Sequence, residues 1–207
     1  MLHQMSDDDD EYQPYYRTRT AAFRFWLGNV PGTKIFDPGL PDKIGSSICC
    51  LPVHGSAKLT TAGIKARLAE QATECGAHCH ASGERGKKEL LYDVVWTSSP
   101  EENGDFQDVY LICETEIARS KQAILQDFRK LLIGKAPMKV MVFALADPEH
   151  HLTVHNGDDL REEMRNMIFR YRNTEVGEVY ILIELGPAEH YEVIRVTDQN
   201  LEDNDLC

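Results

Sequence analysis

Residues 108–145 read DVYLICETEIARSKQAILQDFRKLLIGKAPMKVMVFAL, with a helical pattern between two apolar runs. The first run, rich in Val, Tyr, Leu and Ile, predicts a strand. Ser120 is a typical helix N-cap, and Gly134 ends the helix that follows it. The continuous apolar run 139–145 is typical of a strand buried on both faces. Such a strand–helix–strand unit predicts a parallel pair with a right-handed crossover, and therefore an α/β fold.

The flanking sequence adds further elements to this unit. A helix is expected from Thr60 or Thr61 to Cys75, where Gly76 stops it. A strand is expected at 90–96, and a helix begins at Asp158. Two more strands, at 178–185 and 191–196, close the chain. We therefore predict a central mixed sheet flanked by helices.

The ends of the chain differ in composition from its body. Residues 1–14 form an acidic tail that we expect to be disordered, and residues 198–207 form a second acidic tail. Residues 15–58 contain a strand-like run at 21–27 and many prolines and glycines, which predicts an irregular N-terminal extension. We expect this extension to wrap over the body or to meet a partner protein. The α/β domain should occupy residues 59–197.

The bulk composition is that of a globular domain. Of 207 residues, 42% are hydrophobic and 27% are charged, which suffices for a buried core. No apolar run is long enough to span a bilayer, and the N-terminus lacks the features of a signal peptide. We therefore expect a cytoplasmic protein that does not bind membranes and keeps its six cysteines reduced.

Three acids stand in strand-like sequence: Asp93 in the run 90–96, and Glu114 and Glu116 in the run 108–116. Glu114 and Glu116 project to the same side of a strand because strand side chains alternate. Acids among apolar residues are costly unless they are paired or bound to metal, so the three predict a site for a divalent cation. The alternatives are that Asp93 caps a turn or pairs with a basic residue, and that both glutamates face solvent.

The formal net charge of −12 is concentrated at the two ends. Residues 7–11 contribute −5 and the acids of 198–205 contribute −4, which leaves about −3 for the body. Residues 119–139 carry a local charge of +5 directly after Glu116. Basic residues beside an acidic cluster suit an enzyme that acts on phosphodiesters, although an ordinary solvated helix face is equally compatible.

The order of elements and acids over residues 60–145 resembles the PD-(D/E)xK nuclease superfamily, which has the restriction-endonuclease-like fold. The resemblance implies that Asp93 and Glu114 bind Mg²⁺, with Mn²⁺ as a substitute. Glu116 stands where the family usually has the lysine that orients or activates water. The residue before Asp93 is Tyr92, where the family often has proline.

A minority of restriction enzymes with a similar pattern carry Glu-x-Glu, in which the second acid is a base or a further metal ligand. Glu116 is chemically suited to both roles. Otherwise Lys121 or Lys130 supplies the positive charge, or activity has been lost. The resemblance thus implies a Mg²⁺-dependent endonuclease that hydrolyses DNA, with catalytic residues Asp93, Glu114 and Glu116. The residues expected to hold the DNA backbone are Arg119, Lys121, Arg129 and Lys130.

Two other functions remain open. The first is a nuclease-like domain without catalysis that serves as a binding or assembly subunit, and a homodimer is compatible with either version. The second is a zinc-binding regulatory protein that uses Cys75, His78, Cys79 and His80. Cys49, Cys50 or His54 would add a ligand to that site, although no pair here has the Cys-x-x-Cys spacing of structural zinc.

Overall fold

The computed structural model describes nine parts of the chain, all within a compact unit from Pro31 to Cys207. The expected N-terminal tail, the strand-like run 21–27 and residues 200–207 of the C-terminal tail lie outside these parts. The described residues are 34, 37–51, 57–83, 91–98, 108–118, 120–146, 152–153, 157–186 and 190–199.

A mixed sheet forms the centre of this unit, with its strands in the order β1-β2-β3-β4-β6-β7. β3 and β4 are parallel, as are β4 and β6, and the remaining pairs are antiparallel; the short β5 pairs with β4. The predicted strand–helix–strand unit is therefore confirmed. The strands are β1 (His78–Ala81), β2 (Val94–Thr97), β3 (Val109–Ala118), β4 (Met138–Ala146), β5 (Leu152–Thr153), β6 (Val179–Glu184) and β7 (His190–Arg195).

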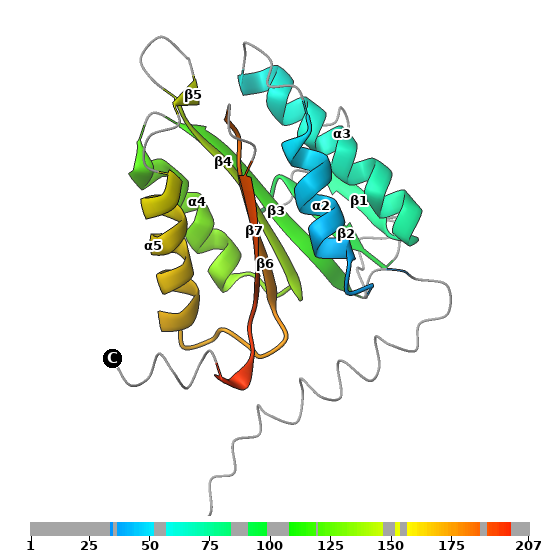
Figure 1. Cartoon of the computed structure of the whole chain (residues 1–207). Coiled ribbons are helices and arrows are strands. Elements are labelled where there is room, and N and C mark those ends of the chain that lie inside the picture. The colour runs from blue at the N-terminus through cyan, green and yellow to red at the C-terminus, as the bar shows by residue number, and fades with distance from the viewer. Residues whose placement is uncertain are drawn as a thin grey trace, which may run out of the picture. The chain divides into compact units, whose positions relative to one another are not determined.

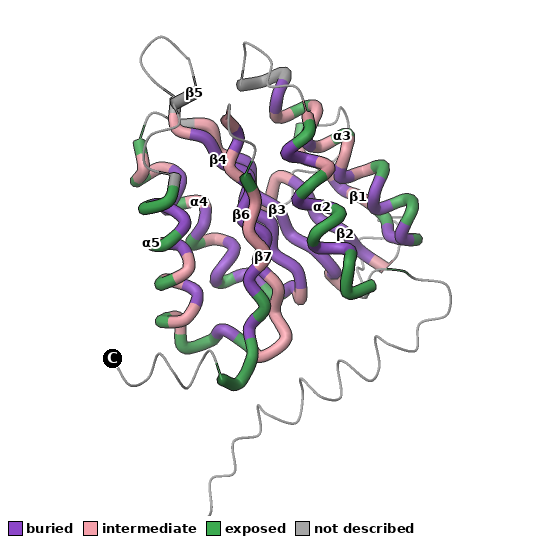
Figure 2. The backbone as a smooth tube through the Cα atoms, in the orientation of Figure 1, coloured by how far each residue is buried: buried purple, intermediate pink, exposed green. Residues whose placement is uncertain are grey.

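Four described helices cover the two faces of the sheet (Figure 1). α2 (Leu40–Cys49) and α3 (Ala57–Cys75) lie on one face, where α3 contacts β1 and β2, and α2 contacts β6 and β7. α4 (Lys121–Ile133) and α5 (Gly157–Arg170) lie on the other. Each helix turns its buried side to the sheet and its exposed side outward (Figure 2). None of the described helices is long and apolar enough to cross a membrane.

The bounds of α4 agree with those predicted. The side-chain Oγ of Ser120 accepts a hydrogen bond from the Ala123 N–H at 3.3 Å, and this caps the first turn. The five apolar residues expected on its inner stripe are all buried. α4 is therefore fixed at the N-terminal end by its cap and along its length by packing.

Alternation along β3 decides which side chains face α4. Ile112 belongs to the core between the sheet and the helices α4 and α5. Glu114 and Glu116 follow it at a spacing of two, so they lie on the same face. The intervening Cys113 and Thr115 lie on the face that α2 and α3 cover. The pattern that places core residues thus also places the two acids under α4.

Residues 40–49 correct the expectation of an irregular extension at 15–58, because they form α2. The helix has proline in its first turn, where the missing N–H is harmless, and it buries Leu40, Ile44 and Ile48 at a spacing of four. Gly45 allows close packing, since a Cβ there would overlap the ring of Tyr191. The glycines and prolines of this segment thus serve a packed helix as well as its connections.

Two further expectations need correction. β1 was not predicted, because His78-Cys79-His80-Ala81 lacks the apolar residues of a typical strand; it pairs with β2 at the edge of the sheet. Asp93 is not inside a strand, since β2 begins at Val94. Residues 91–93 form a bend that precedes β2.

Candidate functional site

Glu114 is a buried acid on the inner side of β3. Only 4% of the residue is exposed, and burial raises the pKa of its carboxyl to about 7, an effect that Lys130 opposes. The nearest cation is the ammonium of Lys130, 3.4 Å from Glu114 Oε1. That oxygen has no hydrogen-bond partner in the described structure. The described contacts of Glu114 therefore stabilise its negative charge only in part.

Glu116 lies two residues further along β3 and meets an acid of α4. Burial raises its pKa to about 7, and a hydrogen bond with the Asp127 carboxyl raises it in the same direction. The negative charge of Asp127 adds to this effect, because it disfavours a second negative charge on Glu116. Glu116 is thus a second acid that titrates near neutral pH.

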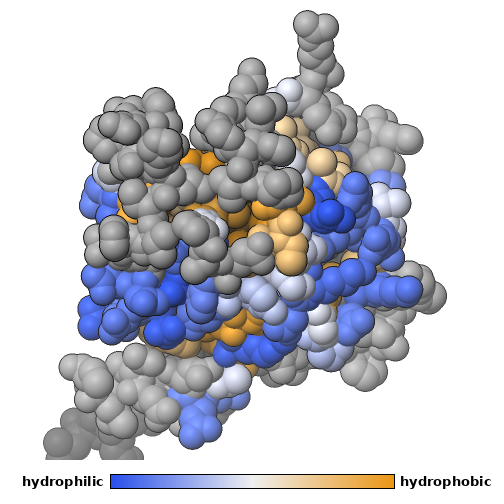
Figure 3. Space-filling model, turned by 45° about the horizontal axis from the view of Figure 1, so that its top comes forward, coloured by the Kyte–Doolittle hydropathy of each residue, from blue (hydrophilic) through white to orange (hydrophobic). Residues whose placement is uncertain are grey.

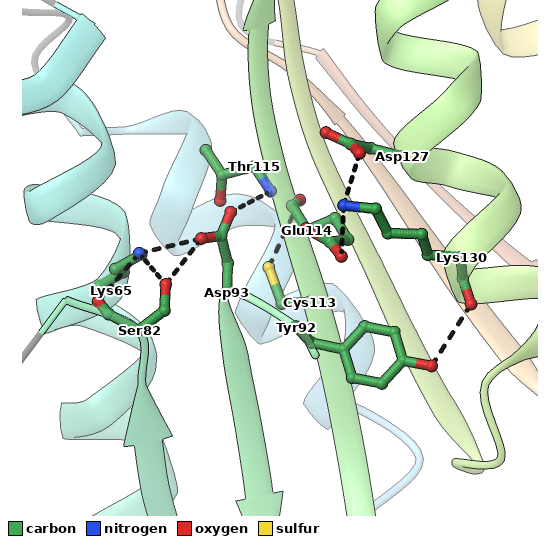
Figure 4. A network of polar contacts seen from close by, with 9 residues as sticks. All are labelled: Lys65, Ser82, Tyr92, Asp93, Cys113, Glu114, Thr115, Asp127 and Lys130. Carbon is green, nitrogen blue, oxygen red and sulfur yellow. Dashed lines mark hydrogen bonds and ion pairs between the residues drawn. The ribbon is translucent and has the colours of Figure 1, made fainter. Parts of the chain in front are cut away.

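Lys130 links these acids to α4. Its ammonium lies 2.7 Å from Asp127 Oδ1 and 3.4 Å from Glu114 Oε1. Asp127 and Lys130 are three residues apart, so they project from the same side of the helix. Figure 4 shows Lys130 extended between the carboxyls of Asp127 and Glu114. One cation is therefore shared by two acids and stands close to a third.

Asp93 occupies a different environment. Its Oδ1 accepts hydrogen bonds from the Lys65 ammonium at 3.0 Å and from the Ser82 hydroxyl at 2.9 Å. Its Oδ2 accepts one from the backbone N–H of Thr115 at 2.9 Å. Figure 4 shows the carboxylate between Lys65 on one side and β3 on the other. Asp93 thus connects α3 to the middle of β3.

Taken together, the site holds more negative than positive charge. Asp93 acts electrostatically on both Glu114 and Glu116, and Asp127 does so too. Four carboxyls thus interact with two ammonium groups, those of Lys65 and Lys130. When all are ionised, two negative charges have no partner among the described residues. Even so, no three His, Cys, Asp or Glu side chains in the described ranges stand as a ready-made metal site.

Four basic residues were expected to bind substrate, and of the three that the structure describes only Lys130 pairs with the acids. Lys121 pairs with Glu163 of α5 at 2.6 Å. Arg129 is exposed and has no ion pair with a described residue. Arg119 lies outside the described residues. Lys139, which was counted in the basic run, is buried against Glu178 and Tyr180, so it adds nothing to a basic surface.

Sequence reasoning missed three residues of the site: Asp127, Lys65 and Ser82. Asp127 carried a usable signal, because it stands three residues before Lys130 on a helix that must cover β3. Lys65 follows the buried Ile64 on α3 and had no such signal. Ser82 could not be placed before β1 was known.

Among the described residues, the expected zinc ligands do not form a group of three that could hold a metal ion. Cys75 is buried at the end of α3, and burial raises its thiol pKa, which opposes the thiolate that zinc needs. His80 is buried, and its Nε2 lies 3.0 Å from Thr97 Oγ1. His78 is exposed. His54 lies outside the described residues. This part of the chain therefore packs α3 against the edge of the sheet.

The described surface around the site carries two exposed large hydrophobic residues. Figure 3 shows hydrophobic residues in the middle of one face, with hydrophilic residues beside and below them. Leu91 and Ile133 are 69% and 62% exposed. Their chain neighbours Tyr92 and Gly134 contact each other, and the Tyr92 hydroxyl donates to the Lys130 carbonyl at 3.4 Å. Tyr92 thus borders the C-terminal end of α4, the helix that carries Lys130.

Comparison with known proteins adds no family to these observations. No protein-family model, no curated protein and no solved structure matches the chain. The function must therefore be argued from the cluster itself: Glu114 and Glu116 of β3, Asp127 and Lys130 of α4, and Asp93 held by Lys65.

Proposed function

We propose that this protein is a metal-dependent nuclease of the PD-(D/E)xK type that hydrolyses phosphodiester bonds of DNA. The observation that carries the proposal is the excess of acid in the cluster, where, among the described residues, four carboxyls interact with two ammonium groups. Two acids are partly buried, and each is driven toward its protonated form near neutral pH. A divalent cation carries the two positive charges that would keep them ionised.

The donor set fits such an ion in chemistry and charge. Carboxylate oxygens are the ligands that Mg²⁺ and Mn²⁺ prefer, and Glu114 Oε1 is a buried oxygen with an ion pair to Lys130 at 3.4 Å but no well-formed hydrogen bond in the described structure. The residues that would hold the ion are Glu114, Glu116 and Asp127, and they need side-chain adjustment, because no three described acids already form a cage. A bound Mg²⁺ or Mn²⁺ supplies polarisation of the phosphate and a lower pKa for water.

The protein's own groups then have separate tasks. Glu116, with a pKa of about 7, is suited to accept a proton from the attacking water at neutral pH. Lys130 supplies a positive charge beside Glu114, which the family usually places at the position of Glu116. Arg129 is exposed on the same helix and is available to a phosphate backbone.

The test is cleavage of plasmid and single-stranded DNA with Mg²⁺ or Mn²⁺ by Glu114→Gln and Glu116→Gln. Both substitutions preserve the size of the side chain and remove its charge. We expect each to lower the cleavage rate by at least about 100-fold. Glu70→Gln is the matched control, because Glu70 is 63% exposed and pairs only with Arg67 among the described residues.

Wild-type protein that leaves DNA intact with either metal would contradict the proposal, as would equal cleavage by wild type and both variants. A nuclease-like domain without catalysis is the second candidate. It is favoured by Asp93, whose two oxygens are already occupied by Lys65, Ser82 and the Thr115 N–H. Binding of DNA without cleavage, measured by fluorescence anisotropy, would support that candidate.

A further inference from the structure

We propose that Asp93 is a positioning residue that holds β3 in place, and that it does not bind the metal ion. Asp93 stands where the family resemblance puts a metal ligand, so the inference departs from that resemblance. It concerns the site of the proposed function, but its structural part is independent of whether the protein cleaves DNA.

The contacts of Asp93 use most of its capacity to accept hydrogen bonds. A carboxylate has about four lone-pair positions, and three are occupied by Lys65, Ser82 and the Thr115 N–H at 2.9–3.0 Å. Lys65 also donates to the Ser82 hydroxyl at 2.7 Å and to the Ser82 carbonyl at 3.2 Å. The Ser82 N–H donates to the Asp93 carbonyl at 2.8 Å. These contacts form a closed network.

The network lies largely out of water and joins separate elements. The side chains of Lys65 and Asp93 are only 18% and 23% exposed. Lys65 belongs to α3, Ser82 follows β1, Asp93 precedes β2 and Thr115 lies within β3. To bind a cation, Asp93 would have to give up the ammonium of Lys65 and leave that charge partly buried without its partner.

The Thr115 contact explains how the network acts on the acids. Thr115 stands between Glu114 and Glu116, so a hydrogen bond to its N–H fixes the backbone from which both glutamates project. Asp93 thereby holds the two acids at a set distance from Asp127 and Lys130 of α4. Loosening this contact should shift both acids only slightly and leave every proposed ligand in place, so that metal binding is largely kept while the geometry of attack is disturbed.

The experiment compares Lys65→Met, Asp93→Asn, the double variant and the conservative Lys65→Arg. Three quantities are measured: the urea midpoint, the Mn²⁺ dissociation constant by calorimetry, and kcat for DNA cleavage at saturating Mn²⁺. Lys43→Met is the matched control, because Lys43 pairs with Glu74 between α2 and α3 and both side chains are 58% exposed.

If Asp93 positions β3, both single variants lower the urea midpoint, and the double variant lowers it by less than the sum of the two. Both keep the Mn²⁺ dissociation constant within about threefold and lower kcat by about tenfold, while Lys65→Arg restores kcat. If Asp93 is a ligand, Asp93→Asn weakens Mn²⁺ binding more than about tenfold. Lys65→Met then strengthens binding, because it frees the carboxylate.

Weaker Mn²⁺ binding in Asp93→Asn, or stronger Mn²⁺ binding in Lys65→Met, would overturn the inference. An unchanged kcat in both variants would overturn it too, because Asp93 would then be a purely structural residue. Lys65→Met alone decides between the roles should Asp93→Asn fail to fold. Wild-type protein that neither binds Mn²⁺ nor cleaves DNA contradicts the proposed function only. The part of the inference that says Asp93 holds β3 is then decided by the urea midpoints, and additive effects of the two single variants would refute it.

Discussion

Glu114 and Glu116 show how a strand can place acids where little water is present to stabilise their negative charge. Both sit on the inner side of β3, and burial is the largest cause of their raised pKa values. Without a metal ion, the cluster reduces its charge by taking up protons. The protonation of two residues should therefore be visible in the stability of the protein.

We predict that the metal-free protein loses stability as pH rises from about 4.5 to 7. Each glutamate binds its proton more tightly when folded, with a pKa of about 7, than when unfolded, with a pKa near 4.5. The folded state therefore holds more protons in this range, and the free energy of unfolding falls with pH. We expect a loss of about 1–3 kcal/mol for the pair, measured by urea unfolding with EDTA at several pH values.

Glu114→Gln should remove part of this loss and be more stable than wild type at pH 8, because a neutral amide replaces a buried anion. Glu70→Gln, at an exposed position, should follow the wild-type curve. A free energy of unfolding that rises between pH 5 and 7 in the wild type would show that both acids are ionised and well compensated when folded.

At the scale of elements, α4 selects which lysine serves the site. Lys121 and Lys130 are nine residues apart, which is two and a half helical turns, so they point to opposite sides. Lys121 accordingly pairs with α5, and Lys130 reaches the acids of β3. Because α4 returns antiparallel to β3, Asp127 meets Glu116 and Lys130 meets Glu114.

We predict that Lys130→Met raises the pKa of Glu114 above 7, because Lys130 is the largest influence that lowers it. The cleavage rate should fall about 10- to 100-fold at pH 7, and the acidic limb of its pH profile should move to higher pH. NMR titration of the Glu114 carboxyl carbon measures the pKa directly.

Lys121→Met is the control on the same helix, with a similarly exposed side chain, and it should leave both quantities unchanged. Equal effects of the two variants would indicate that α4 contributes only general positive charge to DNA binding. A reduced rate with an unchanged pH profile in Lys130→Met would point to the same conclusion.

At the scale of the whole molecule, elements with a local apolar pattern were predicted from the sequence. Features that depend on contacts between residues far apart in the chain were missed. β3, α4 and β4 were predictable because their apolar patterns and the Ser120 cap are local signals. β1 has no apolar pattern and exists because β2 pairs with it. Asp93 was predicted to lie in a strand, yet its carboxylate is held by Lys65, which lies 28 positions away in the sequence. Asp127 joins the site because α4 packs on β3, and this packing brings it to Glu116.

We predict that Mn²⁺ stabilises the folded protein, and that the gain in the free energy of unfolding is larger at pH 8 than at pH 5.5. A ligand that binds only the folded state adds about 2.7 kcal/mol at 100 times its dissociation constant. At pH 5.5 protons occupy Glu114 and Glu116 and compete with the ion, since both pKa values are about 7. Urea unfolding with Mn²⁺ or with NaCl of equal ionic strength measures the difference.

Glu116→Gln should reduce the Mn²⁺ effect at pH 8, because it removes one of the proposed ligands, whereas Glu70→Gln should keep it in full. The comparison between pH values separates binding at this cluster from weak binding elsewhere, because an exposed carboxyl is already ionised at pH 5.5. A Mn²⁺ effect of equal size at both pH values, or one that survives in Glu116→Gln, would place the ion outside the cluster. The two negative charges of the cluster that have no cationic partner among the described residues would then have to be neutralised by protons.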